Sequence, residues 1–217
     1  MQENKEISAY RHTLRDKILV TAMEAFTQHG VRAVKMDDIA HRLGISKRTL
    51  YELYDNKELV LFEGVKRFKA LRERELSQQL GKLGNVMDII LYIYKVKVDE
   101  FGRVNPLFYA DIDRYPLVKR YLEDDKQNGS KRFMDFLRRG ISEGYFQPNL
   151  DYTLVEQMFD GVMQYVAEKQ IYCEYSIKEI FENIIFVMLR GISTPRGVAA
   201  LDELLRNSQA NPLVIPA

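Results

Sequence analysis

The sequence predicts an all-α protein with a small N-terminal head of three helices and a larger helical domain behind it. Apolar residues recur at spacings of three and four along most of the chain, the period of helices that rest on a core. Glycine, proline and capping residues interrupt this pattern, and no stretch alternates polar and apolar residues as a strand does. We place the head at residues 10–56, the larger domain at 57–206 and a disordered tail at 207–217.

The composition is that of a globular protein without export or membrane signals. The chain has 217 residues, of which 46% are hydrophobic, enough to form the core of one large or two small domains. Because no charge-free apolar run reaches about 18 residues and no signal-peptide core stands near the start, we expect a cytoplasmic protein. The single Cys173 excludes an internal disulfide, and we expect it to be a packed side chain rather than a redox sensor.

Residues 35–54 predict a helix-turn-helix. Met36 and Ile39 lie on one face of a first amphipathic helix, and Gly44 can adopt the left-handed conformation that ends it. Ser46 then begins a second short helix, since its hydroxyl can accept a hydrogen bond from an unpaired amide of the first turn.

The second helix of this pair has an apolar inner side and a polar, basic outer side. Leu50 and Leu53 point inward. The residues expected to point largely outward are Lys47, Arg48, Thr49, Tyr51 and Glu52. In a helix-turn-helix the second helix lies in the major groove of DNA. A small basic face on a chain whose net charge is +1 favours specific docking over general coating of nucleic acid.

Two further helices flank the motif. A helix over 10–29 should pack on it and complete the head, through Leu14, Ile18, Ala22, Ala25 and Phe26. A long helix follows, and we expect Asp55 to cap it together with Glu58. Lys57 in its first turn has two interpretations, a solvated lysine or a cation that meets a DNA phosphate at the amide-rich helix start.

The larger domain should be built from several more helices. The sequence predicts one from 86 to 101, a short one after the cap Asn105, and one from Pro116 to about 140. Two strong helices follow at 153–170 and 176–190, the second opened by a capping box of Ser176 and Glu179.

The head resembles the TetR-type (tetracycline-repressor-like) transcriptional regulators over residues 12–62. The resemblance rests on Gly30-Val31, Asp38-Ile39-Ala40, Gly44-Ile45-Ser46-Lys47, Thr49-Leu50-Tyr51 and Asn56-Lys57-Glu58-Leu59. The chain departs from the family at Lys35, where a capping threonine is usual. A lysine there cannot act as the same cap, but it can still reach a phosphate.

The resemblance implies a ligand-responsive DNA-binding regulator, most simply a repressor that a small-molecule effector releases from a palindromic operator. It implies that the helices 153–170 and 176–190 pair with their copies in a homodimer, which places two recognition helices on one operator. The residues expected to contact DNA are Lys35, Lys47, Arg48, Thr49, Tyr51 and Lys57. Of these, Lys47, Arg48 and Thr49 should touch base edges and the others phosphates.

The larger domain is rich in aromatic residues and methionine, which are typical of apolar small-molecule pockets with a few hydroxyl anchors. The candidate pocket residues are Tyr92, Phe108, Tyr109, Phe133, Met134, Met163 and Tyr165. Aromatic residues at helical spacing are more often plain core, so the alternative of an ordinary hydrophobic core stays open for each of them.

The sequence carries no pattern of an enzyme, a cofactor site or a metal site. It has no glycine-rich phosphate loop, no nucleophile elbow and no cluster with metal-ligand spacing, and its three histidines, His12, His29 and His41, all lie in the head. The competing hypothesis is a helical interaction module whose helix-turn-helix contacts protein instead of DNA. Lys57 and the Thr49-Leu50-Tyr51 segment favour DNA, because an exposed phosphate-binding set serves no purpose in a protein contact.

Overall fold

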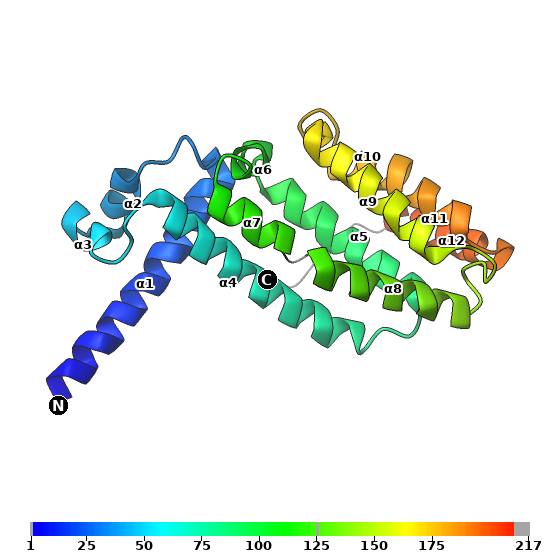
Figure 1. The fold of residues 1–217 in the computed structure, drawn as a ribbon, viewed down its shortest axis with the longest axis horizontal. Coiled ribbons are helices and arrows are strands. Elements are labelled where there is room, and N and C mark those ends of the chain that lie inside the picture. Colours follow the sequence, from blue (N-terminus) through cyan, green and yellow to red (C-terminus); the bar gives the residue numbers. More distant parts are fainter. Residues whose placement is uncertain (1, 125, 211–217) are drawn as a thin grey trace. The chain divides into compact units, whose positions relative to one another are not determined.

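The computed structural model of the protein describes residues 2–124 and 126–210, with side chains described for 9–124 and 129–206. Over these residues the chain is helical, and no strand forms; the only bridge between extended segments in the described part joins Phe146 to Ser193 (Figure 1). The all-α prediction is therefore confirmed. No described helix combines the length and the apolar character needed to cross a membrane.

The chain forms two compact units that alternate along the sequence. The first unit consists of residues 1–77 and 103–124, and the second of residues 78–102 and 125–217. Residues 103–124 therefore belong to the first unit, although the segments before and after them in the sequence belong to the second. We expected a boundary at residue 56 between a DNA-binding domain and the rest of the chain. This functional boundary stays a prediction.

The first unit contains more helix than the predicted head. Its helices are α1 (Gln2–His29), α2 (Met36–Leu43), α3 (Lys47–Tyr51), most of α4 (Lys57–Leu80), α6 (Pro106–Ile112) and α7 (Pro116–Asp124). The N-terminal helix begins at Gln2 rather than at residue 10. Residues 116–124 and 126–142 form two helices instead of the single helix expected there.

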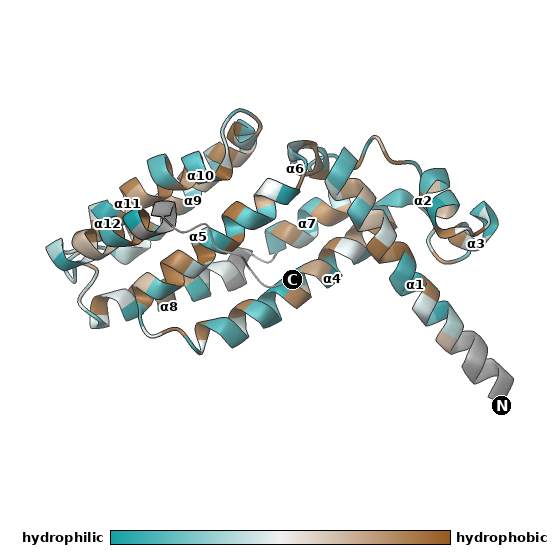
Figure 2. Cartoon of the chain, turned by 180° about the vertical axis from the view of Figure 1, so that it is seen from behind, coloured by the Kyte–Doolittle hydropathy of each residue, from teal (hydrophilic) through white to brown (hydrophobic). Residues whose placement is uncertain are grey.

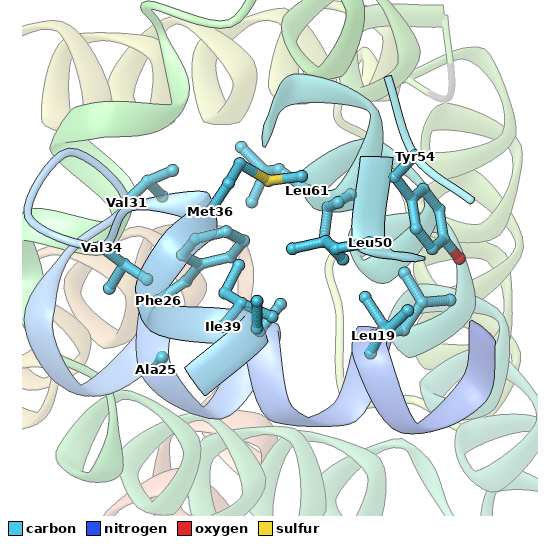
Figure 3. Close-up of a cluster of buried hydrophobic side chains, with 14 of the residues drawn as sticks. Leu19, Ala25, Phe26, Val31, Val34, Met36, Ile39, Leu50, Tyr54 and Leu61 are labelled. Carbon is cyan, nitrogen blue, oxygen red and sulfur yellow. The ribbon is translucent and has the colours of Figure 1, made fainter. Parts of the chain in front are cut away.

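The core of the first unit is the contact of α1 with the helix-turn-helix. Phe26 on α1 is fully buried, as are Ile39 on α2 and Leu50 on α3. Figure 3 shows these side chains pointing toward one another, with Met36 and Leu61 closing the cluster. Because each short helix contributes its apolar face to one shared core, the position of α3 is set by packing rather than by its own stability.

Local sequence signals end and begin these helices largely as expected. Gly44 ends α2 with φ of 64°, and the Ser46 hydroxyl accepts a hydrogen bond from Thr49 N at 3.0 Å. The cap of α4 was predicted wrongly. Asn56, not Asp55, caps this helix, because its Oδ1 accepts from Leu59 N at 2.9 Å.

The excursion back to the first unit brings α6 against α1. Asn105 is the N-cap of α6, with its Oδ1 accepting from Leu107 N at 3.0 Å, as the Asn-Pro pair predicted. Phe108 on α6 is buried and belongs to the same core as the head.

The second unit is built around a separate apolar core. Its helical segments are α5 (Val86–Arg103), α8 (Lys126–Ser142), α9 (Tyr152–Glu168), a 3-10 turn (Ile171–Cys173), α10 (Ile177–Ile180), a π-helical turn (Phe181–Ile185), α11 (Phe186–Ile192) and α12 (Pro195–Ala210). Brown and teal residues alternate along these helices in Figure 2, as amphipathic helices require. Phe146, Phe186 and Leu137 are the fully buried centre of this core, which also includes residues of α5 and α12.

Capping signals are also confirmed in this unit. The Ser176 hydroxyl accepts from Glu179 N at 3.2 Å, while the Glu179 carboxylate accepts from Ser176 N at 2.8 Å. The Ser176 hydroxyl also donates to the Glu179 carboxylate at 2.8 Å, and this hydrogen bond, together with the one from the Ser176 amide, lowers the pKa of Glu179. Asp151 caps α9 through hydrogen bonds from the first two residues that follow Tyr152. The tail predicted at 207–217 is helical as far as Ala210, and residues 211–217 lie outside the described residues.

Gly140 tests how tightly the core of the second unit is packed. A Cβ atom at Gly140 would lie 2.1 Å from the ring of Phe146, which is fully buried and cannot move outward. We expect Gly140→Ala to lower the free energy of unfolding by about 1 to 3 kcal/mol through overpacking, more than the gain of about 1 kcal/mol in helix propensity.

The matched control is Gly102→Ala, since nothing lies within 4 Å of a Cβ at this helical glycine. This variant should be as stable as the wild type or slightly more stable. Urea unfolding of the three proteins at equal concentration compares them, and equal stability of the two variants would contradict the packing described.

Candidate nucleic-acid interface

The helix-turn-helix presents one side of α3 to solvent. Leu50 is fully buried, so the rest of this five-residue helix is fixed with its polar side outward. Lys47, Arg48 and Tyr51 are exposed, and Thr49 is half-buried. The turn is tight, because Ile45 N donates to Ala40 O at 3.1 Å. The structure therefore brings the predicted base-contacting residues together on one accessible surface.

The two cations of α3 are paired with carboxylates of the same head. Lys47 forms an ion pair with Asp37 of α2, and Arg48 Nε lies 3.0 Å from Glu52 Oε1. The hydrogen bond and the charge of Asp37 raise the pKa of Lys47 above its ordinary value. Both pairs are exposed and screened by salt, so DNA can displace the acids at little cost. The sequence pattern gave no sign of the Asp37 pair, which joins residues ten apart on different helices.

Thr49 is held by the residue that begins α3. Its hydroxyl lies 2.8 Å from the Ser46 hydroxyl, and its amide donates to the same oxygen. Ser46 thus caps the helix and also orients a side chain expected to contact a base edge.

Lys35 and Tyr51, the other predicted phosphate contacts, are both exposed. Lys35 stands at the N-cap position of α2, and its amide donates to the Asp38 carboxylate at 2.8 Å. Its own side chain makes no cap hydrogen bond and is exposed. Tyr51 has a side chain that is 46% exposed, which is large for an aromatic residue and leaves its hydroxyl accessible. Both phosphate contacts stay predictions.

Lys57 has surroundings that neither sequence interpretation anticipated. Its ammonium donates to Val31 O at 2.9 Å and to Val34 O at 3.0 Å, both in the turn between α1 and α2. Burial lowers the pKa of Lys57, although Asp111 acts in the opposite direction. A phosphate contact by Lys57 stays a prediction, and it would require the ammonium to release at least one of these carbonyls.

Arg15 is a supporting residue that sequence reasoning missed. Its Nη2 donates to Leu53 O at 3.0 Å, and its guanidinium lies 5.4 Å from the centroid of the Tyr54 ring. The contact ties α1 to the backbone just after α3. Its partners are about 38 positions away in the sequence, so no local pattern could have revealed it.

The predicted pocket residues belong to both units of the chain. Phe108 and Tyr109 belong to the first unit, where they pack with the core of the head. Phe133 and Met134 pack on the core of the second unit, with the Phe133 ring 5.1 Å from that of Phe159. The other three residues are also in the second unit: Tyr92 is half-buried, while Met163 and Tyr165 are exposed.

The head is similar to known proteins. Residues 18–63 match the model described as "Bacterial regulatory proteins, tetR family". The chain is 29% identical over 146 residues to the HTH-type transcriptional repressor KstR2 of Mycobacterium tuberculosis, an alignment that covers 65% of this chain and 73% of the relative.

Solved structures share the fold over most of the chain. A transcriptional regulator from Saccharomonospora viridis in complex with choline superposes with a TM-score of 0.69 at 16% identity, covering 84% of this chain and 99% of that one. The regulator FadR from Bacillus subtilis in complex with stearoyl-CoA gives a TM-score of 0.59 at 16% identity, covering 81% and 98%. At these identities the likeness concerns the fold.

Ser46 offers a test that separates the cap from the charge at this surface. We expect Ser46→Ala to lower the free energy of unfolding by about 0.5 to 2 kcal/mol, since Thr49 N loses its acceptor. Ser46→Asp keeps a capping oxygen but adds a negative charge on the face that we expect to meet DNA.

Thermal unfolding and DNA binding of both variants should therefore rank them in opposite order. Ser46→Asp should be close to the wild type in stability and weaker than Ser46→Ala in DNA binding. If Ser46→Asp bound DNA as well as the wild type, this face would not be the one that meets the phosphates.

Proposed function

We propose that the chain is a TetR-type transcriptional regulator and that it acts as a homodimeric repressor released from a palindromic operator by a small-molecule effector. The match of residues 18–63 to the tetR family model supports the first part of this proposal. The repressor role is supported by the relative KstR2, which is named as a repressor. The operator, the dimer and the effector are separate parts of the proposal, and each rests on different residues.

One observation carries the DNA-binding part of the proposal. The polar side of α3 is exposed and basic, while Leu50 on its opposite side is locked into the core. A helix of five residues is not stable by itself, so a rigidly held one with a polar outer face suits insertion into the major groove.

Within this surface we assign base contacts to Lys47, Arg48 and Thr49, and phosphate contacts to Tyr51 and Lys35. Arginine and lysine donate to guanine O6 and N7, and threonine can contact either a polar edge or a thymine methyl group. Phosphate contacts set the register of the protein on the duplex and carry no sequence information themselves.

The dimer is proposed to form through α9 and the helical stretch 176–190. Leu154, Met158 and Tyr165 recur along α9 at intervals of four and seven residues, and each is more than 40% exposed. On α11, Val187 is 56% exposed. A stripe of large apolar side chains in water is typical of a surface that a partner covers, and a two-fold partner would use the same residues on both chains.

The effector is proposed to bind in the second unit and to have a sizeable apolar part. Phe133, Met134 and Tyr92 offer half-buried apolar surface there, and FadR, which shares the fold, was solved with stearoyl-CoA. For release to occur, the effector must bind the DNA-free arrangement more tightly than the DNA-bound one; an effector with equal affinity for both would shift nothing.

Arg48 provides the test of base recognition. Its side chain is 88% exposed and pairs with Glu52 in the same helix, so its removal should leave the fold intact. We expect Arg48→Ala to reduce discrimination between operator and scrambled DNA by about 1 to 3 kcal/mol.

The measurement is a titration of both DNAs at several salt concentrations. Arg138→Ala serves as the control, because Arg138 is an exposed arginine of α8 paired with Asp135 in the second unit. An equal loss of affinity on operator and scrambled DNA for Arg48→Ala would mean that Arg48 contacts phosphate and not a base.

Val187 provides the test of the dimer surface. We expect Val187→Glu to convert the dimer to a monomer, because two buried carboxylates would face each other near the two-fold axis without partners. Sedimentation velocity over a range of concentrations measures the change. Leu71→Glu is the matched control, since Leu71 on α4 is also about half exposed (49%) but lies outside the proposed surface. A dimeric Val187→Glu protein, or a monomeric Leu71→Glu protein, would contradict this assignment.

A further inference from the structure

The turn between α1 and α2 depends on side chains from elsewhere in the chain. Residues 30–35 form this turn, and they lie outside both helices. Backbone amides and carbonyls without helical partners need other hydrogen bonds when water is excluded. Two residues outside the head, Lys57 and Asp111, supply several of these bonds.

Lys57 satisfies carbonyl groups of the turn. Its ammonium has three donors, and it lies 2.9 Å from Val31 O, 3.0 Å from Val34 O and 3.5 Å from Arg32 O. A cation in the first turn of a helix is opposed by the helix dipole. The carbonyl oxygens of the turn offset this opposition, which explains why the side chain is folded back onto the turn.

Asp111 satisfies an amide of the same turn from the other direction. It is one of the few buried charged or polar side chains of the described residues, at 8% exposed, and its Oδ2 accepts from Arg32 N at 2.8 Å. A carboxylate is seldom buried without a hydrogen bond or an opposite charge. The Arg32 amide provides the hydrogen bond, and the nearby Lys57 ammonium provides the opposite charge.

Asn105 fixes α6 to the end of α1. Its amide donates to Thr27 O at 2.7 Å and its Nδ2 donates to Gln28 O at 3.1 Å, so it pairs two carbonyls of the last turn of α1. Gly30 has φ of 82°, and a Cβ there would lie 3.0 Å from Leu107 Cβ. The turn and α6 are therefore in close contact, and neither can shift independently.

We propose that Lys57 and Asp111 are positioning residues for DNA binding, which clamp the turn 30–35 and thereby fix the start of α2 and the exposed Lys35 in the pose that operator docking requires. The proposal rests on the DNA-binding function proposed above. It gives Lys57 an indirect role in place of the phosphate contact that the sequence suggested, and it gives a role to a buried acid 79 residues away from the turn in sequence.

The two roles for Lys57 predict opposite changes in operator affinity when Asp111 is replaced. If the region acts only through direct contact of cations with phosphate, removing the negative charge of Asp111 should strengthen binding to the polyanion or leave it unchanged. If Asp111 clamps the turn, its removal should weaken binding even though a negative charge is lost. Few substitutions of an acid in a DNA-binding protein carry so clear a contrast.

The experiment measures operator affinity for Asp111→Ala, Asp111→Asn and the control Asp113→Ala, which alters an exposed acid at the end of the same helix. We expect Asp111→Ala to bind the operator at least about tenfold more weakly, since a buried hydrogen bond is lost. Asp111→Asn keeps an oxygen for Arg32 N and should recover most of the affinity. Asp113→Ala should bind as tightly as the wild type.

Amide hydrogen exchange shows whether a weakened variant has a loosened turn or an unfolded head. In Asp111→Ala, exchange in residues 30–35 should accelerate while exchange in the centre of α1 stays as in the wild type. If Asp111→Ala fails to fold, Lys57→Met is measured in its place: it should weaken operator binding and accelerate exchange in residues 30–35.

Two outcomes would overturn the clamp. One is an Asp111→Ala protein that folds and binds the operator as tightly as the wild type or more tightly. The other is a Lys57→Met protein whose salt slope falls by about 0.9 while exchange in residues 30–35 is unchanged, which is the signature of a lost phosphate contact. The wild-type titration keeps the two proposals apart, because a wild type that ignores operator sequence refutes the proposed function and not the clamp alone.

Discussion

The burial of Leu50 against Phe26 and Ile39 is the constraint on which the recognition surface depends. The helix that carries Leu50 has five residues, far fewer than the roughly 12 to 15 that an isolated helix needs for marginal stability. Its existence is therefore a consequence of tertiary packing, and so is its orientation. Because Leu50 is fixed in the core, the helix places Lys47, Arg48 and Tyr51 in solvent.

Support for this packing comes from several directions, each through hydrogen bonds to backbone groups. Ser46 begins α3, Arg15 holds the carbonyl of Leu53 just beyond it, and Lys57 with Asp111 holds the turn before α2. A site that must match DNA to within a fraction of an ångström needs such support, because a short helix held only by apolar contacts would tilt. The acids Asp37 and Glu52 lie on the same surface and keep its cations paired when DNA is absent.

The sequence predicted those features that depend on neighbouring residues. The stop at Gly44, the cap at Ser46 and the capping box at Ser176 each involve residues within a few positions of one another, and all were confirmed. At the start of α4 two adjacent residues could both cap, and the local pattern chose the wrong one. The contacts of Lys57 and Asp111 join segments far apart in sequence, for which no periodic pattern exists. Phe108 and Tyr109, which we expected in the larger domain, pack on the core of the first unit, and nothing local in the sequence indicates that the chain returns to that unit.

Selection of bound DNA from a random duplex library by the purified protein tests whether α3 recognises a DNA sequence. We expect enrichment of one palindromic sequence, with half-sites separated by about one helical turn or a multiple of it, as two recognition helices on a two-fold axis require. Binding to the enriched sequence should exceed binding to scrambled DNA by about a thousandfold or more and should weaken steeply with salt. A library from which no sequence is enriched over repeated rounds would contradict the claim that α3 recognises DNA.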